Sequence, residues 1–209
     1  MNAEPQRTSV LAGTFKLIGF AALAAFIVAG AWQVTHERIR DNQAAARLAR
    51  FAPVLGNVRY DTIDFDHAET LAAPHPLPGD AMAVIYQVRL KGQSTARVFE
   101  VSTQGYSGPI RLLVGIDNNH MVTGTRVISH TETPGLGDDI ERRKSDWIES
   151  FAGVSFDTVA PPAWRLKRDG GHFDGFTGAS VTPRAVVTAV RETLEFAIRN
   201  PVEKAGITP

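Results

Sequence analysis

Three hydroxyl-bearing residues lie close together among small residues near the C-terminus, in residues 174–183 (DGFTGASVTP). We predict that a helix begins directly after them, with Thr182 as its N-cap and Pro183 at its first helical position. The N-terminus of a helix has unpaired N–H groups and the positive end of the helix dipole, so it favours a phosphate group. The same residues also suit a plain capping turn, because they match neither a Walker loop nor a dinucleotide-binding fingerprint.

A second glycine-rich segment, residues 130–138 (HTETPGLGD), lies between a predicted strand and a predicted helix. Two glycines and a proline give it an unusual backbone path, and such loops allow the backbone to approach a ligand closely. An ordinary strand-to-helix connection, with Asp138 or Asp139 capping the helix, would use the same residues. On composition alone, each of the two segments could therefore be a ligand-binding loop or a simple connection.

The composition excludes several classes of site. The 209 residues contain no cysteine, which rules out disulfides, thiolate zinc sites, cysteine-ligated iron–sulfur clusters and a cysteine nucleophile. Lys plus Arg and Asp plus Glu both number 22, so no net charge attracts nucleic acid. The spacing of His75, His120, His130 and His172 suits no metal site. No Ser/His/Asp set follows from the spacing, so no catalytic residue is assigned.

The elements that must position these loops indicate one α+β domain, with a largely antiparallel twisted sheet flanked by helices. Runs of β-branched residues between turn clusters predict hairpin-like strands at 83–90, 97–102, 110–116 and 121–129. A helix is expected at 138–151. In the final helix Val186, Val190, Leu194 and Ile198 recur every four residues and, with Val187 and Ala197 beside them, form an apolar stripe.

An apolar stretch at residues 17–34 contains no charged residue. As a helix it would span roughly 27 Å, close to the thickness of a bilayer core. We expect a single uncleaved membrane anchor, and a cleaved signal peptide and a buried core helix are the alternatives. The expected order is a short tail at 1–16, this transmembrane helix, a helical stalk and connecting loop at 35–80, and the soluble domain at 81–209. The flanking charges lean slightly against an outward C-terminus.

The sequences HTETPGLG and DGFTGASVTPRAVV resemble those of the FMN-binding subunit of Rnf electron-transport complexes, the RnfG/RsxG family. They are more distantly similar to the C subunit of the sodium-translocating NADH:quinone reductase. The resemblance implies an FMN-binding domain that carries FMN as a phosphoester, added from FAD by a flavin transferase. On this chain, Asp174, Thr177, Gly178 and Ala179 match the recognition motif and Ser180 is the attachment residue. The family usually has threonine there, and serine offers the same oxygen with less steric restraint.

The resemblance also implies cofactor-binding roles for residues that flank the attachment point. These are Val181 and Thr182 at the start of the final helix, and a second wall of the site formed by Glu132, Thr133, Pro134, Gly135, Leu136 and Gly137. Tyr106 and Trp147 are possible neighbours of the flavin ring, but ordinary packing is the interpretation that their residue types favour.

By the same resemblance, the chain is an electron carrier and not an enzyme on its own. It would work in a complex that moves electrons between ferredoxin and NAD, coupled to ion movement, with other Rnf membrane subunits as partners. The family places the FMN domain on the periplasmic side of the bacterial inner membrane, on a single-pass anchor. A membrane-tethered flavin-binding redox sensor and a tethered structural domain without a cofactor are the alternatives.

Overall fold

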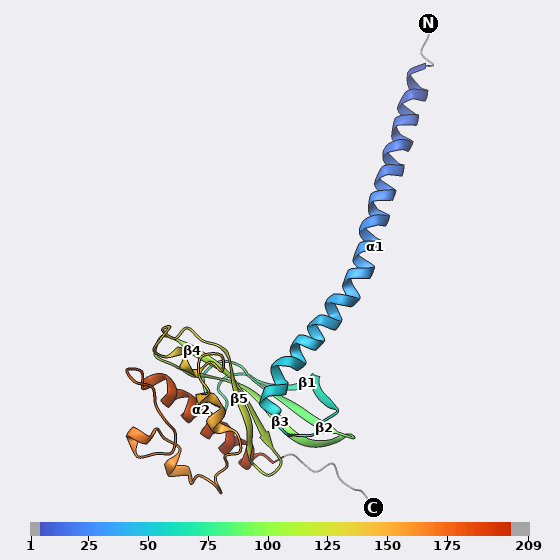
Figure 1. The fold of residues 1–209 in the computed structure, drawn as a ribbon. Helices are drawn as coiled ribbons and strands as arrows, with labels where there is room; N and C mark the ends of the chain where they lie inside the picture. Colours follow the sequence, from blue (N-terminus) through green and yellow to red (C-terminus); the bar gives the residue numbers. More distant parts are fainter. Residues whose placement is uncertain (1–4, 202–209) are drawn as a thin grey trace, which may run out of the picture. The chain divides into compact units, whose positions relative to one another are not determined.

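The computed structural model describes residues 5–201, and it divides the chain into two compact units, 1–49 and 50–209. Helix α1, Pro5–Leu55, fills the described part of the first unit and ends within the second (Figure 1). Good helix formers carry it through to its last turn, where Pro53 precedes Gly56, which has φ +53°. The stalk predicted after the apolar stretch is therefore helical.

Within α1, the stretch Lys16–Gln33 is long and apolar enough to cross a membrane, by length and composition. None of this stretch is buried inside the protein. Large apolar side chains such as Leu23, Phe26 and Trp32 are exposed along it. The interpretation of this segment as the buried core helix of a soluble protein is therefore not supported.

The second unit is built on one five-stranded sheet in which every neighbouring pair is antiparallel, in the order β1-β2-β3-β4-β5. The strands are β1 Thr62–Leu71, β2 Ala83–Leu90, β3 Gln93–Gln104, β4 Pro109–Asp117 and β5 Val122–Ser129. Each strand pairs with the next one along the chain. Short turns join the strands, apart from a longer loop at residues 72–82 between β1 and β2. The α+β fold and the antiparallel sheet predicted from the sequence are confirmed.

Strand β1 was not predicted, because residues 35–80 were expected to hold only a stalk and a connecting loop. Its acids, Asp64, Asp66 and Glu69, obscure the alternation, and the register shifts between Asp64 and Glu69. An edge strand needs only a few inward residues to pack, and here Ile63 is buried while Phe65 contacts the same cluster.

The two faces of the sheet are covered differently. On one face, helix α2, Val181–Arg199, packs against strands β3 and β4 (Figure 1). On the other face, Phe51, Val54 and Leu55 at the end of α1 pack against a smaller cluster that includes Val98 and Leu113. This arrangement leaves the N-terminus of α2 beside the loops at one end of the domain.

The buried side of α2 matches the apolar stripe predicted from the sequence, except at its last position. Val186, Val190 and Leu194 are fully buried and Val187 and Ala197 beside them are buried too, but Ile198 is 37% exposed. Each step of four residues advances about 40° beyond a full turn, so three steps carry the side chain off the buried face.

The helix predicted at 138–151 does not form. The structure has two short 3-10 helices instead, η1 Asp138–Ile140 and η2 Trp147–Phe151, with turns between them. Residues 141–146 (ERRKSD) are all polar, so a continuous helix would have no apolar side chain to bury over this segment. Two further 3-10 helices follow, η3 Pro161–Ala163 and η4 Lys167–Asp169.

Candidate functional site

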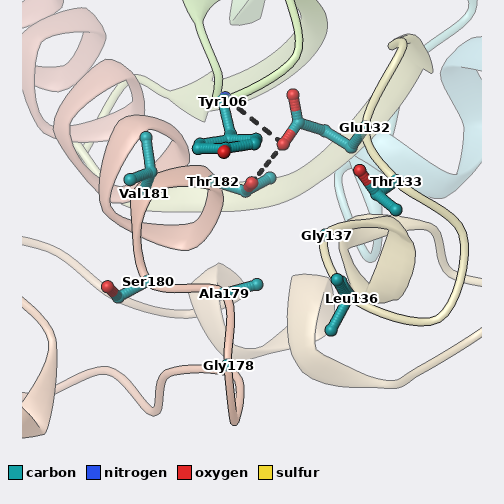
Figure 2. A pocket seen from close by; sticks show the side chains of 10 residues that line it. All are labelled: Tyr106, Glu132, Thr133, Leu136, Gly137, Gly178, Ala179, Ser180, Val181 and Thr182. Carbon is teal, nitrogen blue, oxygen red and sulfur yellow. Dashed lines mark hydrogen bonds between the residues drawn. The ribbon is translucent and has the colours of Figure 1, made fainter.

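A pocket of about 260 Å³ lies where three segments distant in sequence meet. They are the turn between β3 and β4, the glycine-rich loop after β5, and the segment that leads into α2 (Figure 2). Its lining residues are Tyr106, Glu132, Thr133, Leu136, Gly137, Gly178, Ala179, Ser180, Val181 and Thr182. The structure therefore brings together the two loops that the sequence identified separately.

Ser180 occupies the N-cap position of α2, so the helix begins two residues earlier than predicted. The first intrahelical bond runs from the Arg184 N–H to the Ser180 carbonyl, at 3.3 Å. The N–H groups of Val181 and Thr182 precede it and have no acceptor within the helix, while Pro183 has no N–H at all. The first turn contains no acidic residue, so this helix end is electrostatically suited to an anion.

The hydroxyl of Ser180 makes no hydrogen bond to any of the residues that the structure describes, and it does not cap the helix with its side chain. Ser180 is half-buried. Figure 2 shows its side chain and that of Ala179 pointing to opposite sides of the segment that enters α2. This hydroxyl is thus available at the rim of the pocket.

Gly178 gives the segment its turn. Its φ is +80°, a conformation that side chains rarely adopt. An added Cβ would also lie only 3.6 Å from Leu136 Cδ2, so the two loops are in close contact at this point. The glycine of the motif is therefore required for backbone conformation.

Thr182 does not cap the helix, contrary to the prediction from the sequence. It is fully buried, and its hydroxyl donates to the carboxylate of Glu132. The sequence prediction placed the helix start at the Thr-Pro pair, but the backbone of residues 180–182 is already helical, which turns the Thr182 side chain inward.

Glu132 makes more hydrogen bonds than any other side chain that lines the pocket, and only 5% of the residue is exposed. Its carboxylate accepts hydrogen bonds from the backbone N–H of Tyr106, at 3.3 Å, and from the Thr182 hydroxyl (Figure 2). It also accepts the backbone N–H of Ser107 at 3.0 Å. A buried carboxylate is tolerated when its oxygens receive several hydrogen bonds. Glu132 therefore links all three segments of the pocket.

Two glycines make room for this carboxylate. A Cβ at Gly137 would lie 2.9 Å from Glu132 Oε2 and 2.9 Å from Thr182 Oγ1. A Cβ at Gly105 would collide with Glu132 Oε1. Neither glycine has a positive φ, so both are needed for their lack of a side chain.

The loop after Glu132 is held by its own backbone and by Asp138. The N–H groups of Leu136 and Gly137 both donate to the Thr133 carbonyl, at 3.1 Å, and Gly135 has φ +77°. Asp138 does not cap a long helix; its Oδ1 accepts the Gly135 N–H at 2.6 Å. Burial acts to raise the pKa of Asp138, but the Gly135 hydrogen bond and the nearby Lys144 outweigh it and lower the pKa.

Four of the predicted site residues, Pro134, Gly135, Asp174 and Thr177, do not line the pocket. Asp174 and Thr177 are exposed on the approach to α2. The Asp174 carboxylate pairs with Lys167 at 2.8 Å, which is an exposed ion pair. These two residues are accessible to another protein.

The two aromatic residues considered from the sequence have different environments. Trp147 packs edge-on against Phe151 and Phe176, and its indole N–H donates to the Asp174 carbonyl at 2.7 Å. Tyr106 lines the pocket with 75% of the residue exposed, so ordinary packing does not explain it. The sequence signal that favours an exposed ring is the tight turn in which Tyr106 lies, between Gly105 and Gly108.

Comparison with protein families matches residues 105–195 to the FMN-binding domain. That range begins at the Gly105 turn and ends within α2, so it contains all three segments of the pocket. The match supports FMN as the ligand class of this region.

Relatives match the chain over nearly its whole length. It is 41% identical over 207 residues to the G subunit of the ion-translocating oxidoreductase complex of Pseudomonas aeruginosa, covering 96% of this chain and 94% of that protein. It is 39% identical over 208 residues to the G subunit of the same complex in Cereibacter sphaeroides, covering 99% and 90%.

Among solved structures, the chain is similar to the C subunit of the Na⁺-translocating NADH-quinone reductase of Parabacteroides distasonis. The identity is 19% and the TM-score 0.42, over 57% of this chain and 63% of that one. The NqrC protein of Shewanella oneidensis matches with 18% identity and a TM-score of 0.41, over 64% of this chain and 75% of that one.

Proposed function

The chain belongs to the family of G subunits of ion-translocating oxidoreductase complexes, and from this premise we propose that it carries electrons through an FMN esterified to Ser180. The observation that carries this proposal is the free Ser180 hydroxyl at the N-terminus of α2, on the rim of a pocket within the matched FMN-binding region. A phosphate esterified there would meet the N–H groups of the first helical turn.

The residues around the pocket fit such a group. The segment from Gly178 to Ser180 carries only small side chains, which leaves space beside the hydroxyl. Leu136 and Val181 are 46% and 44% exposed and Tyr106 is 75% exposed, so apolar and aromatic surface is available for a flat ring. The proposed second wall consists of Glu132, Thr133, Leu136 and Gly137, the residues of that loop that line the pocket. FMN, when bound, supplies reversible transfer of electrons, while the protein positions it.

The attachment is a phosphoryl transfer in which FAD is the donor and a flavin transferase the catalyst. The Ser180 oxygen bonds to the phosphorus of the FMN half of FAD. The bond from that phosphorus to the bridging oxygen breaks, AMP leaves, and the hydroxyl proton passes to a base of the transferase. Asp174, Thr177, Gly178 and Ala179 form the motif that the transferase reads, and the exposure of Asp174, Thr177 and Gly178 is compatible with this role.

We also propose how the chain is placed in the cell. Residues 17–34 span the bacterial inner membrane after a short tail at 1–16, and the FMN domain lies on the periplasmic side. The compact second unit begins at Arg50 and includes β1. The connection between the membrane span and the soluble domain is therefore shorter than the 35–80 segment expected from the sequence. The partners are the other membrane subunits of an Rnf-type complex, which passes electrons between ferredoxin and NAD and couples this to ion transport.

The intact mass of the full chain tests the attachment. Purified from a bacterial host that makes the flavin transferase, the protein should carry the mass of one FMN ester and fluoresce on a denaturing gel. Ser180→Ala should lose both signals. Ser107→Ala is the control, because it removes a hydroxyl from the neighbouring turn and should leave both signals. A Ser180→Ala variant that keeps covalent fluorescence would contradict the proposed attachment site.

A further inference from the structure

The Glu132 carboxylate has an unusual set of partners for a buried charge. Both backbone donors come from the turn that carries Tyr106, and the third donor is the Thr182 hydroxyl, 50 residues further along the chain. Among the side chains that the structure describes, no Lys, Arg or His forms an ion pair with it. Its oxygens are therefore satisfied by two backbone N–H groups and one hydroxyl.

The hydrogen bond to Glu132 controls the rotation of the first helical turn. Residues two apart on a helix lie about 200° apart around its axis. Because Thr182 points inward to the carboxylate, Ser180 must point to the opposite side. Figure 2 shows this arrangement, with the Thr182 hydroxyl toward Glu132 and the Ser180 side chain directed away.

Other contacts do not fix this rotation as directly. Pro183 is buried beside Thr182, but its ring makes no polar contact with the pocket wall, and the next buried apolar side chain of α2 is Val186, a turn further along. Arg184, which lies between them, forms an exposed ion pair with Asp169. Among the described residues, the hydrogen bond that joins the first turn of α2 to the pocket wall is thus the one from Thr182 to Glu132.

We propose that Glu132, acting through Thr182, is a positioning residue that fixes the first turn of α2 so that the Ser180 hydroxyl is presented on the open side of the pocket for attachment of FMN. The proposal rests on the proposed function. It assigns to the buried glutamate of the 130–138 segment a task distinct from contact with the flavin, and it accounts for the two glycines that leave room for its carboxylate.

The test uses the full chain made in a host without the transferase, to which purified flavin transferase and FAD are then added. Thr182→Val removes the hydroxyl and keeps the branched shape. Thr193→Val is a matched control, because Thr193 is also fully buried in α2 but bonds only to the Ala189 carbonyl, at 2.7 Å. Thr182→Ser keeps a hydroxyl that can still reach Glu132.

The initial rate of covalent labelling is the first measurement. We expect Thr182→Val to lower it on the order of tenfold or more, because a small displacement of the reacting oxygen slows a transfer strongly. Thr193→Val should be labelled close to the wild-type rate, and Thr182→Ser should recover most of the lost rate. Labelling of Thr182→Val at the wild-type rate, or equal slowing by Thr193→Val, overturns the proposal.

Amide hydrogen exchange is the second measurement, and it requires no flavin. Exchange at residues 105–108 and 180–184 should be faster in Thr182→Val than in the wild type, and unchanged in Thr193→Val. If the wild type itself takes no flavin, the proposed function has failed and the role in attachment fails with it. Exchange then decides only whether Thr182 and Glu132 hold the first turn of α2: faster exchange at both segments supports this anchor, and unchanged exchange overturns it.

Discussion

At the scale of single residues, the pocket depends on one buried carboxylate. Glu132 was selected from the sequence only because it lies in the HTETPGLG segment that the resemblance identified. Its partners could not be predicted, since they lie on a turn 25 residues before it and on a helix 50 residues after it. Sequence patterns report local spacing, whereas this carboxylate is stabilised by contacts between distant segments.

Glu132→Ala should destabilise the domain. It leaves the N–H groups of Tyr106 and Ser107 and the Thr182 hydroxyl without their acceptor, at a cost of about 1–3 kcal/mol. The thermal unfolding midpoint of the full chain measures this loss. Glu195→Ala is the control, because Glu195 forms only partly exposed ion pairs with Arg191 and Arg199, and its removal should shift the midpoint little. Equal midpoints for Glu132→Ala and Glu195→Ala would show that Glu132 does not hold the pocket together.

Asp138 should give the loop an acid-sensitive contribution to stability. Its pKa is lowered in the folded protein by the Gly135 N–H and by Lys144, against the opposing effect of burial. A lowered folded pKa stabilises the protein above the unfolded pKa, and this stabilisation is lost as the pH falls below about 4.

Asp138→Asn tests this expectation by removing the titrating group. Its unfolding midpoint should lie below that of the wild type at pH 7, and the difference should shrink between about pH 5 and pH 3. A difference that stays constant over this range would mean that Asp138 stabilises the loop without its charge.

At the scale of elements, the sequence predicted four strands correctly because each has a run of β-branched residues between turn clusters. It failed for β1, where acidic residues on an edge strand hide the alternation, and for 138–151, where helix propensity had no apolar face to support it. The residues that the resemblance identified on the two loops are far apart in the sequence, and only the fold brings the loop after β5 beside the segment that enters α2.

The end of α1 is joined to the sheet by close backbone contact. Gly115 and Gly124 are cross-strand partners on β4 and β5. A Cβ at Gly124 would lie 2.8 Å from the Pro53 carbonyl oxygen and 3.0 Å from that of Val54. Thr123 Oγ1 also donates to the Val54 carbonyl, at 2.6 Å. Strands β4 and β5 can therefore lie this close to the backbone of residues 53–54 only because Gly115 and Gly124 have no side chains.

Gly124→Ala should consequently destabilise the second unit by about 1–3 kcal/mol, since the added methyl group forces the segment at Pro53 and Val54 to move. The thermal unfolding midpoint again provides the measurement. Gly175→Ala serves as the control, because its Cβ would meet only Leu166 Cδ1, at an ordinary 3.4 Å. If both variants unfold at the same temperature, close packing at Gly124 does not matter for stability.

At the scale of the whole molecule, the two ends of the membrane span should lie on opposite sides of the inner membrane. The chain has no cysteine, so each introduced cysteine is a unique label. Ser150→Cys, at an exposed residue of the domain, should react with a membrane-impermeant maleimide in intact spheroplasts. Asn2→Cys, in the N-terminal tail, should react only after lysis. The reverse pattern would place the domain in the cytoplasm.

The most direct test of the central claim is peptide mass spectrometry of the protein from native membranes of cells that make the transferase. Trypsin should release residues 169–184, which contain Thr177, Ser180 and Thr182 as alternative hydroxyls. We predict that fragmentation of this peptide places one FMN ester on Ser180. An unmodified peptide, or an ester on either threonine, would contradict this assignment.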